Sequence, residues 1–196
     1  MRDRAWVTTG AGDDFLRIYM NDQLALGVLW REVARRSQRS NEGTALGDAL
    51  ARVSGAIAED VATFEQIMER LGIPRNPIKA RLALVAERVG RLKLNGSLRS
   101  YSPLSRFVEL DFLAMGIDGK KLLWANLRDL AGLSSRLPDV DFDRLVERAQ
   151  WQRDEIEPFR VAAGATALGG ASDGAADLRR SSGGIRARLL GERTSH

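Results

Sequence analysis

The most constraining feature of the sequence is an uninterrupted helical pattern over residues 44–71. Apolar side chains recur every three or four residues in this stretch, and no proline breaks the pattern. They are Leu46, Leu50, Val53, Ile57, Val61, Phe64, Ile67 or Met68, and Leu71. This spacing puts them on one face of an α-helix. Thr44 is a suitable N-cap, and Gly72 followed by Pro74 ends the pattern. A helix with one apolar face has to pack against other helices.

Two more segments before residue 100 carry helical signals. The first begins near Asp13 or Asp14, which are suitable caps, and ends in arginines at positions 35–39, which favour a helix C-terminus. A shorter segment begins at Pro77, a residue well suited to the first helical position, and its apolar stripe runs to Leu92.

Two further helices are predicted after residue 100. Ser102 as N-cap and Pro103 at the first helical position start one that runs to about residue 134, and Gly-Ile-Asp-Gly at 116–119 is expected to interrupt it. Asp141 caps the last helix, in which Pro158 is expected to cause a kink or an end.

The predicted fold class is therefore all-α. No strand-like alternation is present, and four long amphipathic helices with short connections predict an up-down four-helix bundle with an extra short helix. We expect a flexible arm at 1–12, the bundle at 13–163 and a disordered Gly/Arg-rich tail at 164–196, because this tail has seven glycines in 33 residues. No apolar run approaches a membrane span and there is no cysteine, so we expect a cytoplasmic protein.

Several segments form a recognisable set: those at 19–25, 58–60, 67–68, 71–72, 89–96, 102–105 and 119–124, for example Tyr-Met-Asn-Asp-Gln-Leu-Ala and Val-Gly-Arg-Leu-Lys-Leu-Asn-Gly. Over about 14–168 they resemble an uncharacterised bacterial family of ferritin-like helical bundles. It implies a ferritin-like fold, and fold alone does not transfer an activity.

The ferritin-like resemblance raises the question of a metal site. Di-iron sites in such bundles use Glu-x-x-His on two helices, and this chain has one histidine, at its last position. A site made of carboxylates alone is the open alternative, with Asp22, Asp60, Glu109 and Asp111 as candidates for Mg²⁺, Ca²⁺ or Mn²⁺. The other alternative is that these acids pair with arginines, and we expect no cofactor.

Catalytic templates find no support in the residues. There is no Gly-rich phosphate loop after a strand, no internal histidine and no cysteine nucleophile. We therefore expect a non-enzymatic protein.

Positive charge is concentrated in residues 75–106. This basic segment holds eight Lys and Arg residues and one acid, a net charge of +7 against +4 for the whole chain. Its candidate anion-binding residues are Arg81, Arg88, Arg91, Lys93 and Arg99, which suit a phosphate-bearing or acidic partner. The alternative is ion pairing with acids on neighbouring helices.

Three tryptophans, Trp30, Trp124 and Trp151, lie on or near the apolar stripes. Such rings pack in cores or at subunit contacts. We expect a helical bundle that acts through protein interaction, as a homodimer formed by helix faces.

Overall fold

The computed structural model describes residues 11–76 and 102–169. They form four long helices and one short one: α1 (Ala11–Ser40), α2 (Ala45–Arg70), α4 (Pro103–Asp129), α5 (Leu133–Arg136) and α6 (Phe142–Leu168). No strand is present in these two ranges. The prediction of an all-α chain is confirmed for this part of the protein.

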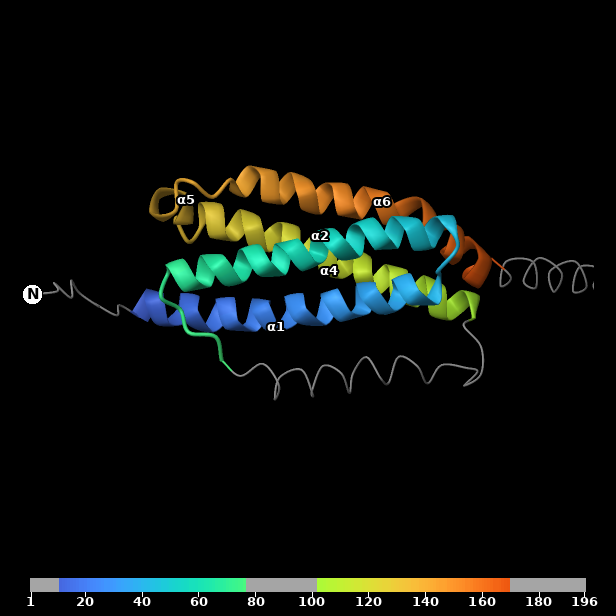
Figure 1. Cartoon of the computed structure of the whole chain (residues 1–196), viewed down its shortest axis with the longest axis horizontal. Helices are drawn as coiled ribbons and strands as arrows, with labels where there is room; N and C mark the ends of the chain where they lie inside the picture. Colours follow the sequence, from blue (N-terminus) through green and yellow to red (C-terminus); the bar gives the residue numbers. More distant parts are fainter. Residues whose placement is uncertain (1–10, 77–101, 170–196) are drawn as a thin grey trace, which may run out of the picture.

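The long helices lie side by side (Figure 1). α1 packs mainly on α2, and α4 mainly on α6. Each of these two pairs is antiparallel, whereas α2 and α4 run in the same direction (Figure 1). The long helices therefore follow the order up, down, down, up, and the ends of α2 and α4 that residues 77–101 connect lie at opposite ends of the structure. The helix predicted from Pro77 lies outside the described residues.

The predicted caps are confirmed where the structure describes them. The Thr44 side chain accepts a hydrogen bond from the backbone N–H of Gly47 at 3.1 Å, and Ser102 accepts one from Ser105 at 3.1 Å. Asp141 caps α6 through the N–H of Arg144 at 2.9 Å. Each bond satisfies an N–H that the first turn of a helix leaves without a backbone partner.

Three predicted boundaries were wrong. α1 begins at Ala11, inside the predicted arm, so Asp13 and Asp14 lie in its first turn, where acidic side chains suit the helix dipole. α4 runs unbroken through 116–119 and ends at Asp129 rather than near residue 134. α6 continues to Leu168, into the predicted tail.

α6 also continues through Pro158 instead of ending there. A proline inside a helix costs roughly 3 kcal/mol. The part of α6 beyond it is held by α4: Arg160 donates to Asp111 at 3.0 Å, and a Cβ placed on Gly164 would lie 2.9 Å from Phe107. These contacts pack the C-terminal part of α6 on α4.

Two apolar clusters divide the interior along its length. Phe64 and Trp124 meet in the first, with ring centroids 5.7 Å apart in an edge-to-face arrangement. The second is built around Leu50, Leu113 and Ile156. Within the described residues, no helix combines the length and apolar character needed to cross a bilayer.

Candidate functional site

A buried carboxylate lies at the junction of the two clusters. Asp60 is 2% exposed, and its α2 neighbours Ile57 and Val61 belong to different clusters. An ionised carboxylate in such a place is very unfavourable unless it is paired and hydrogen-bonded. Its partners therefore decide whether the helices can pack here.

Asp60 receives hydrogen bonds from two other helices. Lys120 of α4 donates to Oδ2, Arg148 of α6 donates to Oδ1, and the Gln152 amide of α6 donates to Oδ2 at 2.8 Å. Lys120 also donates to Oε1 of Gln152, and Arg148 pairs with Glu59 at 3.3 Å. Together, Glu59, Asp60, Lys120, Arg148 and Gln152 form what we call the Asp60 network, which ties α2, α4 and α6 together.

Lys120 is the member of this network whose charge is most disfavoured by burial. Its side chain is only 14% exposed, and burial lowers the pKa of its ammonium group below 10.5. The nearby charge of Arg148 lowers it further, whereas the charge of Asp60 and its hydrogen bond raise it. Asp60 is thus the group that makes a buried ammonium tolerable.

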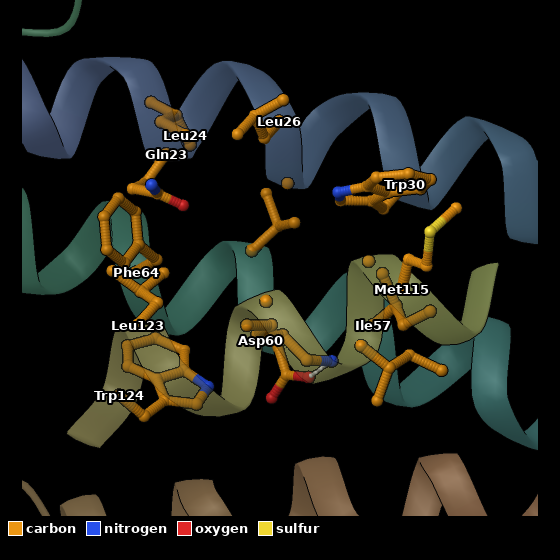
Figure 2. A pocket seen from close by; sticks show the side chains of 16 residues that line it. Gln23, Leu24, Leu26, Trp30, Ile57, Asp60, Phe64, Met115, Leu123 and Trp124 are labelled. Atoms are coloured by element: carbon orange, nitrogen blue, oxygen red, sulfur yellow. Dashed lines mark hydrogen bonds and ion pairs between the residues drawn. The ribbon is translucent and has the colours of Figure 1, made fainter. Parts of the chain in front are cut away.

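A cavity of about 230 Å³ lies against this network, enclosed by α1, α2 and α4. Its walls are mostly apolar, and Gln23, Asp60 and Lys120 are the lining residues with amide or charged side chains. Figure 2 shows Gln23 and Asp60 among them. The apolar lining residues are Leu24, Leu26, Trp30, Ile57, Val61, Phe64, Met115, Ile117, Leu123 and Trp124. Leu26 and Met115 are 38% and 57% exposed, so they mark the side on which the cavity meets solvent.

Glycines shape the cavity. A Cβ on Gly116 would lie 2.3 Å from the Trp30 ring, so only glycine lets that indole pack flat on α4. Trp30 also contacts Phe112, with ring centroids 4.2 Å apart. A Cβ on Gly119 would meet nothing within 4 Å, which leaves the rim open. The 116–119 segment that suggested a helix break therefore serves packing inside a continuous helix.

Trp124, one of the lining residues, carries a buried indole nitrogen without a hydrogen-bond partner among the described residues. Trp124 is 1% exposed, and its indole Nε1 makes no hydrogen bond there. Figure 2 shows this nitrogen on the side of the ring that is turned toward Asp60. The Asp60 oxygens already accept from Lys120, Arg148 and Gln152.

A second feature is an apolar surface where α1 and α4 meet. The Asn126 amide donates to the Tyr19 hydroxyl at 3.4 Å, which fixes the register of the two helices. Phe15 is one turn from Tyr19, and Leu122 and Leu130 are one turn either side of Asn126. The α1/α4 surface, as we call it, consists of Phe15 (70% exposed), Leu122 (61%) and Leu130 (83%) near this contact, together with Ile18 (50%), which neighbours Phe15 on the outer side of α1.

The structure does not bring the four predicted metal ligands together. Asp60 contacts Lys120, and Lys120 lies nine residues from Asp111 along α4. Nine residues span about 14 Å of helix, so Asp60 and Asp111 are far apart. Glu109 pairs with Arg36 at 2.8 Å, Asp111 pairs with Arg160 at 3.0 Å, and Asp22 is exposed. In the two described ranges, no group of three or more acidic or histidine side chains is placed to hold a metal ion.

The predicted anion-binding residues, Arg81, Arg88, Arg91, Lys93 and Arg99, lie outside the described residues. At the edge of that segment, Arg75 pairs with Glu65 at 3.4 Å.

Trp124 belongs to the core, as expected for an apolar stripe, whereas Trp151 is 41% exposed. No sequence pattern had pointed to Lys120, Arg148 or Gln152 as partners of Asp60. One signal was available: Gln152 lies on the apolar stripe of its helix, and a polar residue at such a position needs a buried partner.

Comparison with protein-family models, with curated proteins and with solved structures finds no match for this chain.

Proposed function

We propose that this protein is a non-enzymatic helical bundle that acts through protein interaction, and that it pairs with a second copy through the α1/α4 surface. The observation that carries the proposal is the exposure of Phe15, Ile18, Leu122 and Leu130, between 50% and 83%, on two adjoining helices. Large apolar side chains gathered in one place on a surface are typical of interaction sites.

A second copy is the partner that this surface fits best. α1 and α4 run antiparallel and each contributes large apolar side chains (Figure 1). A two-fold axis across the surface would set α1 of one copy on α4 of the other. The apolar side chains of α1 would then contact those of the partner's α4, and the same contact would occur a second time by symmetry. The partner then has the same chemistry by symmetry.

Light scattering coupled to size-exclusion chromatography tests the pairing. We expect a dimer for the native chain and monomers for Ile18→Glu and Leu122→Glu, because each would bury an unpaired charge at the interface. Val161→Glu is the matched control, since Val161 is 54% exposed but lies on α6. A native chain that stays monomeric at about 100 µM, some hundredfold above a micromolar Kd, or a control that dissociates equally, would contradict the proposal.

The ferritin-like relationship is part of the same proposal. Ferritin-like bundles have one long crossover connection. The parallel directions of α2 and α4, whose connected ends lie far apart, support that topology (Figure 1). We also propose a cytoplasmic location, which a chain without cysteine fits.

A second candidate function is binding of a phosphate-bearing or acidic partner by the basic segment. Its support is the charge of +7 within residues 75–106 of a chain whose total is +4. Retention on heparin that falls steeply with salt is the expected result, because phosphate contacts release counterions. A flat salt response would remove this candidate. We do not extend the proposal to a carboxylate metal site, since Asp60, Glu109 and Asp111 each pair with a separate cation.

A further inference from the structure

One amine lies in the wall of the cavity between α1, α2 and α4. Lys120 is the only lysine among the lining residues, and no cysteine, serine or histidine is among them. Gln23, Trp30 and Trp124 also carry N–H donors in their side chains, but amide and indole nitrogens are not nucleophiles. Lys120 pairs with Asp60, another lining residue, and Figure 2 shows this ion pair at the cavity wall. Lys120 is therefore the one side chain of the wall that can form a bond with a carbonyl carbon.

The Lys120 ammonium group is not fully occupied by its partners. An ammonium group has three N–H donors, and those of Lys120 donate to Oδ2 of Asp60 and to Oε1 of Gln152. The third makes no hydrogen bond to any residue that the structure describes. The Lys120 side chain is 14% exposed, whereas that of Asp60 is 2% exposed. A molecule in the cavity can therefore contact Lys120 while Asp60 stays covered.

Burial makes this amine more nucleophilic than a surface lysine. Lysine attacks a carbonyl carbon only as the neutral amine, and an apolar environment favours that form. Burial has the largest effect on the pKa of Lys120 and lowers it below 10.5, although the charge of Asp60 acts in the opposite direction. Asp60 also accepts a hydrogen bond from the same nitrogen, so it is placed to take its proton. Lys120 is therefore neutral more often than an ordinary lysine at the same pH.

The cavity selects a reactant by size and by polarity. Its volume is about 230 Å³, and an engineered apolar cavity of about 150 Å³ holds benzene, so a ring with a short substituent fits. The cavity meets solvent at Leu26 and Met115, which gives such a molecule a way in. The Asp60 network already balances two cations with two carboxylates, so a charged molecule would lose its hydration without gaining an unpaired partner. The reactant that suits these walls is uncharged and mostly apolar.

We propose that Lys120 captures a small, uncharged, apolar aldehyde in this cavity as a protonated imine. The Lys120 ammonium group passes one proton to Asp60, and the neutral nitrogen forms a bond with the aldehyde carbon. A second proton moves from the nitrogen to the former carbonyl oxygen, which becomes a hydroxyl group. Asp60 returns its proton to this hydroxyl group, the carbon–oxygen bond breaks and water leaves. The product keeps one N–H and one positive charge beside Asp60, so the charge balance of the network is unchanged.

Reductive trapping on the full chain tests the capture. The protein is incubated with benzaldehyde and sodium cyanoborohydride, which reduces an imine to a stable amine, and peptide mass spectrometry measures the label on each lysine. The chain has four: Lys79, Lys93, Lys120 and Lys121. Lys121 is the internal control, because it does not line the cavity and makes an exposed hydrogen bond to Gln150. We expect Lys120 to be labelled at least about tenfold faster than Lys121, since a bound aldehyde is held beside the amine.

A second aldehyde tests whether the cavity is responsible. 4-Carboxybenzaldehyde has the same ring and carbonyl group but carries a carboxylate. The carboxylate changes the intrinsic reactivity toward both lysines alike, so the readout is the ratio of the Lys120 label to the Lys121 label. We expect this ratio to be at least about tenfold lower than with benzaldehyde, because burial of an unpaired charge is costly. This comparison needs no variant and so does not depend on how a substitution affects folding.

Two glycine variants place the reaction inside the cavity. Gly119→Leu puts a side chain at the open rim, and Gly55→Leu is the matched control on α2, where a Cβ also meets nothing within 4 Å. With benzaldehyde, Gly119→Leu should slow the labelling of Lys120 to about the rate of Lys121, and Gly55→Leu should change neither. Circular dichroism checks that both variants are folded.

Three results would overturn the proposal. One is labelling of Lys120 no faster than that of Lys121 in the native chain. Another is the same label ratio with both aldehydes, which would mean that the cavity does not select the reactant. The third is an equal effect of the two glycine variants. The proposal does not rest on pairing through the α1/α4 surface, and we expect the same label ratios in Ile18→Glu.

Discussion

Replacing Asp60 by asparagine keeps the shape of the side chain and removes only its charge. Lys120 then remains buried, 14% exposed, without the carboxylate that stabilises its ammonium group. Breaking a buried ion pair by removing one partner costs roughly 3–5 kcal/mol. The asparagine oxygen still accepts a hydrogen bond, so we expect a loss near the lower end, about 3 kcal/mol.

Urea unfolding at pH 7, followed by far-ultraviolet circular dichroism, measures this loss. A change of about 3 kcal/mol corresponds to a fall in Tm of roughly 6–12 °C for a chain of this size. Glu59→Gln is the matched control, because Glu59 is next to Asp60 and also pairs with Arg148, but its side chain is 71% exposed. Exposed pairs contribute about 0–1 kcal/mol.

The stability loss of Asp60→Asn should also depend on pH. Burial lowers the pKa of Lys120 below its ordinary value of 10.5, and Asp60 opposes that shift. Without Asp60 the pKa falls further, so the folded variant releases this proton at a lower pH than the unfolded chain does. Stability rises with pH wherever the unfolded state binds more protons. The deficit of Asp60→Asn should therefore shrink between pH 7 and pH 9.5.

A double variant tests the cause directly. Adding Lys120→Met to Asp60→Asn removes the stranded cation and should restore most of the lost stability, as replacement of buried ion pairs by apolar groups often does. A free energy of unfolding for Asp60→Asn within about 1 kcal/mol of the native value, or an equal loss in Glu59→Gln, would refute this role of Asp60.

Three further predictions address other parts of the structure. Gly116→Ala should destabilise the fold by about 1–3 kcal/mol, because its Cβ would lie 2.3 Å from the Trp30 ring. Gly119→Ala should stabilise it by up to about 1 kcal/mol, because alanine favours a helix and its Cβ meets nothing within 4 Å; thermal unfolding compares the two. Arg160 and Arg153 lower the pKa of Glu157 from 4.5 to about 2, so Glu157 contributes stability above pH 4.5 that is lost as the pH falls toward 2. Glu157→Gln should therefore lower the free energy of unfolding at pH 7 and make it change less between pH 4.5 and pH 2, as measured by urea unfolding across that range. Thr44→Ala removes the N-cap of α2 and should cost about 1 kcal/mol in urea unfolding, and an unchanged midpoint would contradict the capping role.

The sequence determined the helices and the starts of α2, α4 and α6. Helical periodicity is local, and so are the capping bonds of Thr44, Ser102 and Asp141, which involve residues three positions apart. The same local signals failed at 116–119, where α4 is continuous, and the helix end considered at Pro158 does not occur. Glycine and proline weaken a helix, but at both places the helix also packs against a neighbouring helix.

Only the tertiary structure decided which polar residues share a site. Asp60 looked like one of several acids near apolar stripes, and Asp22 and Asp111 looked equivalent to it. Helix packing left Asp22 exposed and placed Asp60 at the junction of two clusters, where Lys120 and Gln152 meet it from 60 and 92 residues away in the chain. No periodicity encodes such a meeting, because it depends on how three helices are rotated and aligned. The sequence therefore determined the helices, and their packing decided the buried network, the cavity beside it and the apolar side chains left exposed on α1 and α4.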